Sequence, residues 1–255
     1  MQIIKKAKKK INAAILIIGN EILSGRTQDL NVSFISNWLN VNCGISVLEV
    51  RIIPDIQKKI ISNVVSLSKK FKYVFTTGGI GPTHDDITAL SISKAFKVKY
   101  NFNNEAHSIL ENYYGKKNFN NARKKMAKMP VGSKLIYNPS SAAPGFMIKN
   151  VLCLPGVPSI LKSMMPNLKS FLIKGDSVIS KTVSLITVES RIADYLTKLQ
   201  KKYSKKIDIG SYPFFRLGKV GVSVVFRSVN RELIKKCVVE FLKTARQNKI
   251  KIHSL

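Results

Sequence analysis

One glycine-rich turn constrains the fold of this chain more than any other segment. The turn follows the aromatic and β-branched run Tyr73–Thr77, which is typical of a buried parallel strand, and it leads into residues 87–96, which are typical of a helix. It reads Gly78-Gly79-Ile80-Gly81-Pro82-Thr83-His84-Asp85-Asp86. Backbone N–H groups and the positive end of a helix dipole converge at such a turn. We therefore expect a ligand with a phosphate group to bind there.

Two adjacent carboxylates, Asp85 and Asp86, close this turn. They would repel a phosphate unless a divalent cation lay between the carboxylate and phosphate oxygens. A simpler interpretation is that one aspartate caps the helix, because Asp is a common N-cap residue. The chain has only 14 acidic residues against 43 basic ones, so two acids side by side after a glycine turn favour a metal-assisted site.

The first part of the chain alternates between strand and helix patterns. Residues 13–18, 45–53 and 73–77 are expected to be strands, and apolar residues recur at helical spacing between them. This βαβαβ order predicts a mostly parallel sheet with helices on both faces. After Lys174-Gly175-Asp176 the pattern changes to a small α+β unit. We therefore expect two domains, residues 1–175 and residues 176–255.

Acidic residues gather where the predicted strands end. Glu21 follows the first strand, Asp55 the second, and Asp85 and Asp86 the third. The carboxyl ends of parallel strands meet at one edge of the sheet, where ligands bind in folds of this kind. The clustering predicts a site there, although Asp55, and Asp29 in the first loop, could equally be helix caps.

The net charge of +29 at first suggests a nucleic-acid partner. However, the basic residues are mostly lysines scattered along the chain, and the lysine-rich stretch 5–10 lacks interleaved aromatics of the stacking kind. We expect only weak, non-specific and salt-sensitive binding to nucleic acid. No apolar run approaches the roughly 18 residues of a membrane span, so a cytoplasmic protein without a membrane partner is expected.

Five motifs occur in order along the chain. They are Gly19-Asn20-Glu21-Ile22-Leu23 with Gly25 and Asn31, Thr77 to Thr88, Ala143-Pro144-Gly145-Phe146, Leu154-Pro155-Gly156-Val157-Pro158, and Gly210-Ser211-Tyr212-Pro213. Together they resemble the molybdopterin-binding (MoaB/Mog-like) domain family, in its branch similar to the N-terminal part of CinA (competence/damage-inducible protein A). The resemblance implies an α/β fold, a three-layer mostly parallel sheet of the MoaB/Mog type with a small C-terminal α+β domain, and a homo-oligomer.

The chain departs from this family in three ways. Asn20 stands where Asp or Thr is usual, and Ser141 replaces a glycine, which would change how closely that backbone approaches a ligand. We expect the nicotinamide-mononucleotide deamidase domain that often follows, and its activity, to be absent.

The resemblance implies chemistry on a small-molecule nucleotide or pterin ligand. The leading hypothesis is a metal-dependent pyrophosphohydrolase acting on ADP-ribose-like or dinucleotide substrates. The alternatives are a molybdopterin-binding or adenylylating protein of molybdenum cofactor biosynthesis, and a nucleic-acid-associated protein whose site is vestigial. The first two would use the same residues and a divalent metal (Mg²⁺, Co²⁺ or Ni²⁺), with molybdopterin as a possible ligand.

Each candidate residue has an expected role. Asp85 and Asp86 would hold the metal and act in catalysis, and Glu21 and Asp55 would be further metal ligands or water activators. The expected ligand-binding residues are Asn31, Gly78, Gly79, Gly81, Thr83, Ser141, Gly145 and Gly156.

Overall fold

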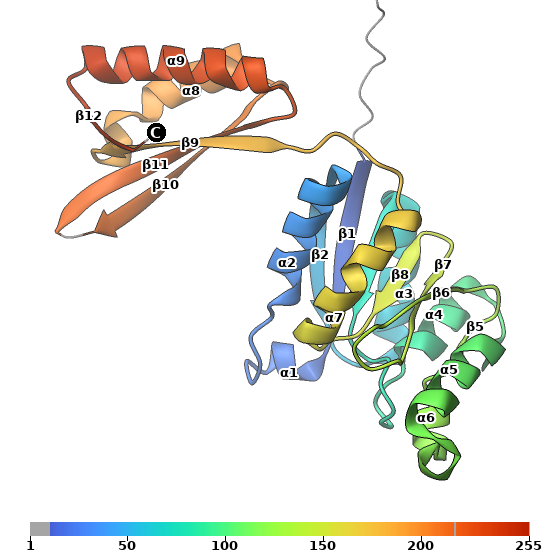
Figure 1. Ribbon diagram of the computed structural model, residues 1–255. Coiled ribbons are helices and arrows are strands. Elements are labelled where there is room, and N and C mark those ends of the chain that lie inside the picture. Colours follow the sequence, from blue (N-terminus) through green and yellow to red (C-terminus); the bar gives the residue numbers. More distant parts are fainter. Residues whose placement is uncertain (1–10, 217, 255) are drawn as a thin grey trace, which may run out of the picture. The chain divides into compact units, whose positions relative to one another are not determined.

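The computed structural model describes residues 11–216 and 218–254, which form two units (Figure 1). The first unit extends to Asp176 and the second begins at Ser177. None of the helices in the described ranges is long and apolar enough to cross a membrane.

The first unit is built on a six-stranded sheet with the order β2-β1-β3-β8-β7-β6. Strands β2, β1, β3 and β8 run parallel, and β7 and β6 add an antiparallel edge. The mostly parallel α/β fold expected from the sequence is therefore confirmed. The strands are β1 (Ile11–Ile18), β2 (Ile45–Ile53), β3 (Tyr73–Thr77), β6 (Lys134–Ile136), β7 (Gly145–Ile148) and β8 (Val151–Leu154).

Helices connect these strands and cover both faces of the sheet. They are α1 (Asn20–Leu23), α2 (Asn31–Trp38), α3 (Gln57–Lys70), α4 (Thr88–Phe96), α5 (Asn104–Tyr114), α6 (Asn121–Lys125) and α7 (Pro158–Met164). A π-helical turn (Leu39–Cys43) extends α2 and ends at Gly44, whose φ of 63° is left-handed. Short 3₁₀ helices (Lys116–Asn118, Met165–Ser170) follow α5 and α7, and strands β4 (Tyr100–Phe102) and β5 (Lys128–Pro130) pair with each other.

A separate hydrophobic core lies on each face of the sheet. On one face, Ile60 and Val64 of α3 and Ile92 of α4 are fully buried. On the other face, which helices α2 and α7 cover (Figure 1), Ile35 of α2 and Leu161 of α7 are fully buried. Strands β1 and β3 lie between these two layers and are almost wholly buried, as the central strands of a parallel sheet must be. The three-layer arrangement brings the carboxyl ends of β1, β2, β3 and β8 to one edge.

The second unit has a core of its own. Its four-stranded sheet has the order β10-β11-β9-β12, and Phe226 of this sheet packs edge-on against Phe241 of a covering helix. The strands are β9 (Ile179–Ile186), β10 (Asp208–Arg216), β11 (Lys219–Ser228) and β12 (Lys251–Ser254); the helices are α8 (Ala193–Lys202), α9 (Arg231–Gln247) and the 3₁₀ turn Glu189–Arg191. Strand β12 is an element that the sequence pattern did not predict.

Candidate functional site

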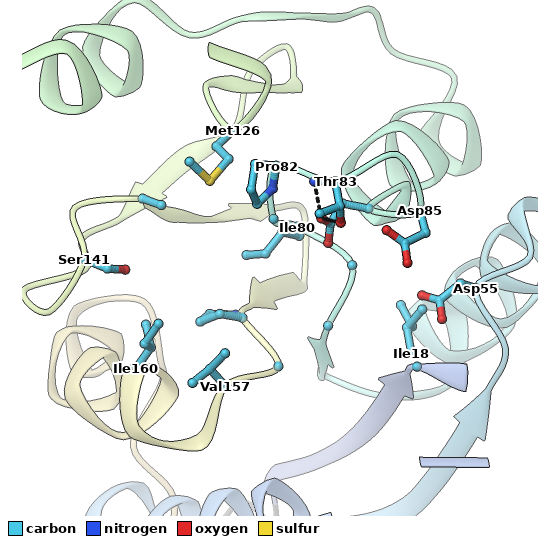
Figure 2. Close-up of a pocket in the computed structure, with 18 of the residues that line it drawn as sticks. Ile18, Asp55, Ile80, Pro82, Thr83, Asp85, Met126, Ser141, Val157 and Ile160 are labelled. Atoms are coloured by element: carbon cyan, nitrogen blue, oxygen red, sulfur yellow. Dashed lines mark hydrogen bonds between the residues drawn. The ribbon is translucent and has the colours of Figure 1, made fainter. Parts of the chain in front are cut away.

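The loops that follow four parallel strands enclose a cavity of about 760 Å³ (Figure 2). A volume of this size lies within the range of roughly 300–1,000 Å³ that is usual for small-molecule sites. Eight of the predicted ligand-binding or acidic residues line it together with Gly19 and Asn138: Glu21, Asp55, Gly78, Gly79, Gly81, Thr83, Asp85 and Asp86. Ser141 and Gly156 also line it, and Gly156 lies beside the glycine turn and not opposite to it. The strand order therefore assembles most of the predicted site.

Glycines allow the backbone of the turn to pass close to the neighbouring loops. Gly78 has φ 96°, and a Cβ added there would lie 2.1 Å from the carbonyl oxygen of Ile18. Gly79 has φ 68°, and its Cβ would lie 2.2 Å from Thr88 Oγ1. In the adjacent loop after β8, a Cβ on Gly156 would come within 3.3 Å of the Gly78 Cα. Only glycine satisfies both the left-handed backbone and the close contact at positions 78 and 79.

Asp86 helps to hold the turn together. Its Oδ2 accepts hydrogen bonds from the backbone N–H of Thr83, at 2.8 Å, and from the Thr83 hydroxyl (Figure 2). Helix α4 begins at Thr88 after Ile87, without a side-chain cap, so neither aspartate is a helix N-cap. The simpler interpretation of these residues is therefore wrong. One oxygen of Asp86 is therefore engaged within the turn.

Asp85 and Asp55 point their carboxylates toward one another in the cavity (Figure 2). Asp55 Oδ2 accepts the backbone N–H of Asn20 at 2.9 Å, and helix α3 starts after Ile56 with no side-chain cap. Burial raises the pKa of Asp55, and the charges of Glu21 and Asp85 raise it further against that hydrogen bond. By contrast, hydrogen bonding from Thr83 and the backbone lowers the pKa of the exposed Asp85. Asp55 is thus a partly buried acid that its acidic neighbours repel.

Asp29 has a different role from these two acids. Its Oδ1 accepts the backbone N–H of Val32 at 2.9 Å, in the first turn of α2. It does not line the cavity. This hydrogen bond favours the alternative interpretation, in which Asp29 supports the start of a helix.

The acid pair suits a cation that is bound only in part by protein. Within the described ranges, no group of three or more His, Cys, Asp or Glu side chains is arranged to hold a metal ion. Mg²⁺ commonly takes one or two carboxylates and completes its shell with water and substrate phosphate oxygens. The donors Asp55 and Asp85 fit that mode, and all-oxygen donors favour Mg²⁺ over softer metals.

Two predicted ligand residues lie behind the cavity wall and do not line the cavity. Asn31 is buried and donates its Nδ2 to the Gly156 carbonyl at 2.7 Å, so it holds the loop after β8 in place. Gly145 begins β7, where a Cβ would lie 2.4 Å from the Cys153 carbonyl oxygen. The glycine there permits close strand packing. For both residues, the sequence motif indicated a position near the site, but it did not indicate that the residue supports a neighbouring loop or strand and does not contact the cavity.

The facing wall is organised by one buried amide, Asn138. Its Nδ2 donates to Ser141 Oγ at 2.8 Å and to the Ala143 carbonyl at 2.9 Å, and its Oδ1 accepts the N–H groups of Ser140 and Ser141. The serine at position 141 therefore contributes to the loop through its side chain. The left-handed residue of this loop is its neighbour, Ala142, with φ 61°.

Three further lining residues come from the polar segment between α4 and β5, and the sequence pattern did not predict them. Tyr114, Arg123 and Met126 border the cavity, and the Arg123 guanidinium lies 4.1 Å from the centre of the Tyr114 ring. The lysine-rich composition of this segment indicated a solvated surface. The aromatic residues Tyr114 and Phe119 among its basic residues were the available signal.

A parallel α/β domain with a glycine turn and acidic residues at its carboxyl edge is typical of proteins that bind phosphorylated small molecules. The chain belongs to the probable molybdopterin binding domain family, whose model matches residues 14–174. Residues 177–253 match the middle domain of FAD synthase. The predicted MoaB/Mog-like membership is confirmed, and the matched C-terminal part is a domain distinct from the deamidase.

Relatives cover most of the chain. A protein from Archaeoglobus fulgidus is 33% identical over 228 residues, which are 89% of this chain and 95% of the relative. A protein from Pyrococcus abyssi is 31% identical over 249 residues, 92% of this chain and 96% of the relative. The crystal structure of CinA from Thermoplasma acidophilum, a protein described as of unknown function, superposes with a TM-score of 0.60 and 30% identity. The superposed region covers 64% of this chain and 99% of the CinA chain.

Proposed function

We propose that this chain is a metal-dependent pyrophosphohydrolase that binds a nucleotide with a pyrophosphate group, such as ADP-ribose or FAD, in the cavity. One observation carries the proposal. The glycine turn and the carboxylates of Glu21, Asp55 and Asp85 line the same cavity, in a chain that has only 14 acidic residues. Carboxylates beside a phosphate-binding turn would repel the phosphate unless a bound cation lay between the carboxylate and phosphate oxygens.

The residues divide the work between binding and activation. Backbone N–H groups of Gly79 and Gly81 would donate to phosphate oxygens. Asp85 and Asp55 would hold the divalent metal, for which Mg²⁺ is the first choice and Co²⁺ and Ni²⁺ the alternatives. When bound, the metal neutralises the developing charge on the phosphate oxygens. Asp86 and Thr83 keep the turn in shape through their mutual hydrogen bonds.

Glu21 is the proposed general base. Its exposed carboxylate folds back over Gly19, with Oε1 2.6 Å from the place where a Cβ on that glycine would be. It would take a proton from a water molecule whose oxygen forms a bond to one phosphorus, while the bridging P–O bond breaks. ADP-ribose and water would then give AMP and ribose 5-phosphate, and Glu21 would release the proton to solvent.

A second candidate function is molybdopterin binding, which the matched family description favours. A pterin with a phosphate group would use the same glycine turn. The match of residues 177–253 to the FAD synthase middle domain supports FAD among the nucleotides to test.

The direct experiment measures AMP release from ADP-ribose and FAD with Mg²⁺, Co²⁺ or Ni²⁺. We expect metal-dependent release by the wild type and a loss of about 100-fold or more in Asp85→Asn, because a carboxylate that holds the metal is removed. Asp29→Asn is the matched control, since it removes the same charge away from the cavity and keeps the oxygen that accepts the Val32 N–H.

The outcomes separate the candidates. Turnover retained in Asp85→Asn would show that the metal assignment is wrong. If the wild type releases no AMP from either compound, the hydrolase proposal fails, and binding of molybdopterin becomes the next measurement.

A further inference from the structure

We propose that Arg123 binds a phosphate of the substrate, which makes the α5–α6 segment part of the substrate site. The inference rests on the proposed pyrophosphate-bearing ligand. Of the described residues that line the cavity, Arg123 is the one with a cationic side chain. A metal held by Asp55 and Asp85 neutralises one side of a pyrophosphate, and a second positive group is needed for the rest of its charge.

The Arg123 side chain is held in place before any ligand arrives. Its Nη1 donates to the Asn118 carbonyl at 2.5 Å, which fixes the turn before α6. Its guanidinium lies over the Tyr114 ring at 4.1 Å, a cation–π contact that restricts the side chain further. Both Tyr114 and Arg123 border the cavity. Because the Arg123 side chain is already held in one conformation, less conformational entropy is lost when a ligand binds.

The guanidinium keeps donors available for a ligand. A guanidinium has five N–H groups, and among the described residues Arg123 uses one of them in a hydrogen bond and forms no ion pair with a carboxylate. Unpaired arginine donors beside a phosphate site match phosphate oxygens in a bidentate manner. The chain has 43 basic residues, and most of them are lysines, so an arginine here is not explained by the lysine-rich composition.

The α6 segment is also tied to the glycine turn. The Lys125 ammonium donates to the Thr83 carbonyl, and Met126, three residues after Arg123, points into the cavity (Figure 2). Residues three apart lie on the same side of a helix. Arg123 of α6 and Met126, which directly follows the helix, therefore both border the cavity, while Lys125 joins the end of the helix to the turn.

The test compares binding of ADP and of adenosine, both with Mg²⁺, by calorimetry in the full-length protein. Arg123→Ala is expected to weaken ADP binding by roughly 10–100-fold, the usual effect of losing a hydrogen bond to a charged group, and to leave adenosine binding unchanged. Lys124→Ala is the matched control. It removes the same charge from the same helix, and Lys124 lies over the Phe119 ring at 5.7 Å and does not line the cavity.

A second variant guards against a merely structural effect. Arg123→Lys keeps the charge but loses the planar pair of donors, so ADP binding should fall between those of the wild type and Arg123→Ala. Equal ADP affinity in Arg123→Ala and Lys124→Ala, with affinity lost in Asp85→Asn, overturns this inference and leaves the proposed function standing. A wild type that binds no ADP overturns both.

Discussion

Asp55 shows how a single residue of the site can reduce the stability of the fold. Its pKa is raised, first by burial and then by the charges of Glu21 and Asp85. The folded state therefore holds a proton on Asp55 more tightly than the unfolded state does. Protonation of Asp55 consequently increases the free energy of unfolding as the pH falls from the raised pKa to the ordinary pKa. At neutral pH, Asp55 is ionised and this stabilisation is absent.

We predict that Asp55→Asn raises the melting temperature of the metal-free protein at pH 7. Asparagine removes the repulsion yet keeps an oxygen that accepts the Asn20 N–H. Thermal denaturation measured across pH should show this advantage shrinking as the wild-type Asp55 becomes protonated. The same variant should lose most of the stabilisation that Mg²⁺ gives the wild type. A lower melting temperature of Asp55→Asn at pH 7 would show that the Asp55 carboxylate stabilises the fold despite its acidic neighbours.

A second residue-scale prediction concerns Gly78. Gly132→Ala should lower the free energy of unfolding by about 1 kcal/mol, because Gly132 has φ 86° but open space around its Cβ position. Gly78→Ala should lower the free energy of unfolding by about 2 kcal/mol more, because the added Cβ also collides with the Ile18 carbonyl at a similar φ. Urea denaturation of both variants measures the difference. Equal losses would show that the loop yields easily and that close packing does not define the turn.

At the scale of a single loop, Asn138 organises the wall that faces the glycine turn. Asn138→Ala removes the hydrogen bonds to Ser141 and Ala143 and should destabilise the protein by about 2 kcal/mol. It should also raise the KM for the nucleotide, because Ser141 and Ala143 line the cavity. Urea denaturation and steady-state kinetics measure the two effects separately.

Asn150 provides the matched comparison for this loop. Its Nδ2 donates to the carbonyls of Ser68 and Phe71, and it does not line the cavity. Asn150→Ala should therefore lower stability by a similar amount and leave KM unchanged. A raised KM in both variants would attribute the effect to general loosening of the fold.

At the scale of the whole molecule, each unit has its own hydrophobic core. The two cores of the first unit flank its six-stranded sheet, and the core of the second lies between its four-stranded sheet and the helices α8 and α9. The CinA structure from Thermoplasma acidophilum covers 64% of this chain and is itself covered to 99%, so a chain of about the size of the first unit forms this fold by itself.

We predict two thermal transitions for the full chain in scanning calorimetry. ADP with Mg²⁺ should raise the transition of the first unit only, because a ligand stabilises the unit whose folded form it binds. A shift of both transitions by the same amount would show that the two units unfold together.

Local patterns in the sequence were enough to predict the strands β1, β2 and β3 and the alternation of strand and helix in the first part of the chain. Strand β3 is buried throughout and is followed by glycines, and its apolar, β-branched pattern is a property of adjacent residues that does not depend on distant contacts. Strand β12 was missed because its short segment, Lys251–Ser254, is mostly polar and has no alternating apolar pattern. Its strand conformation depends on pairing with β9.

The sequence by itself determined the parallel order of the sheet, and with it the gathering of Glu21, Asp55 and Asp85 at one edge. Only the tertiary structure decided which atoms remain free there. It engages Asp86 with Thr83, places Asn31 and Gly145 behind the wall, and brings Arg123 onto Tyr114. The physical reason is that the alternation of strands and helices along the chain follows from local patterns, whereas the direction of a side chain in a loop depends on contacts between segments far apart in the chain.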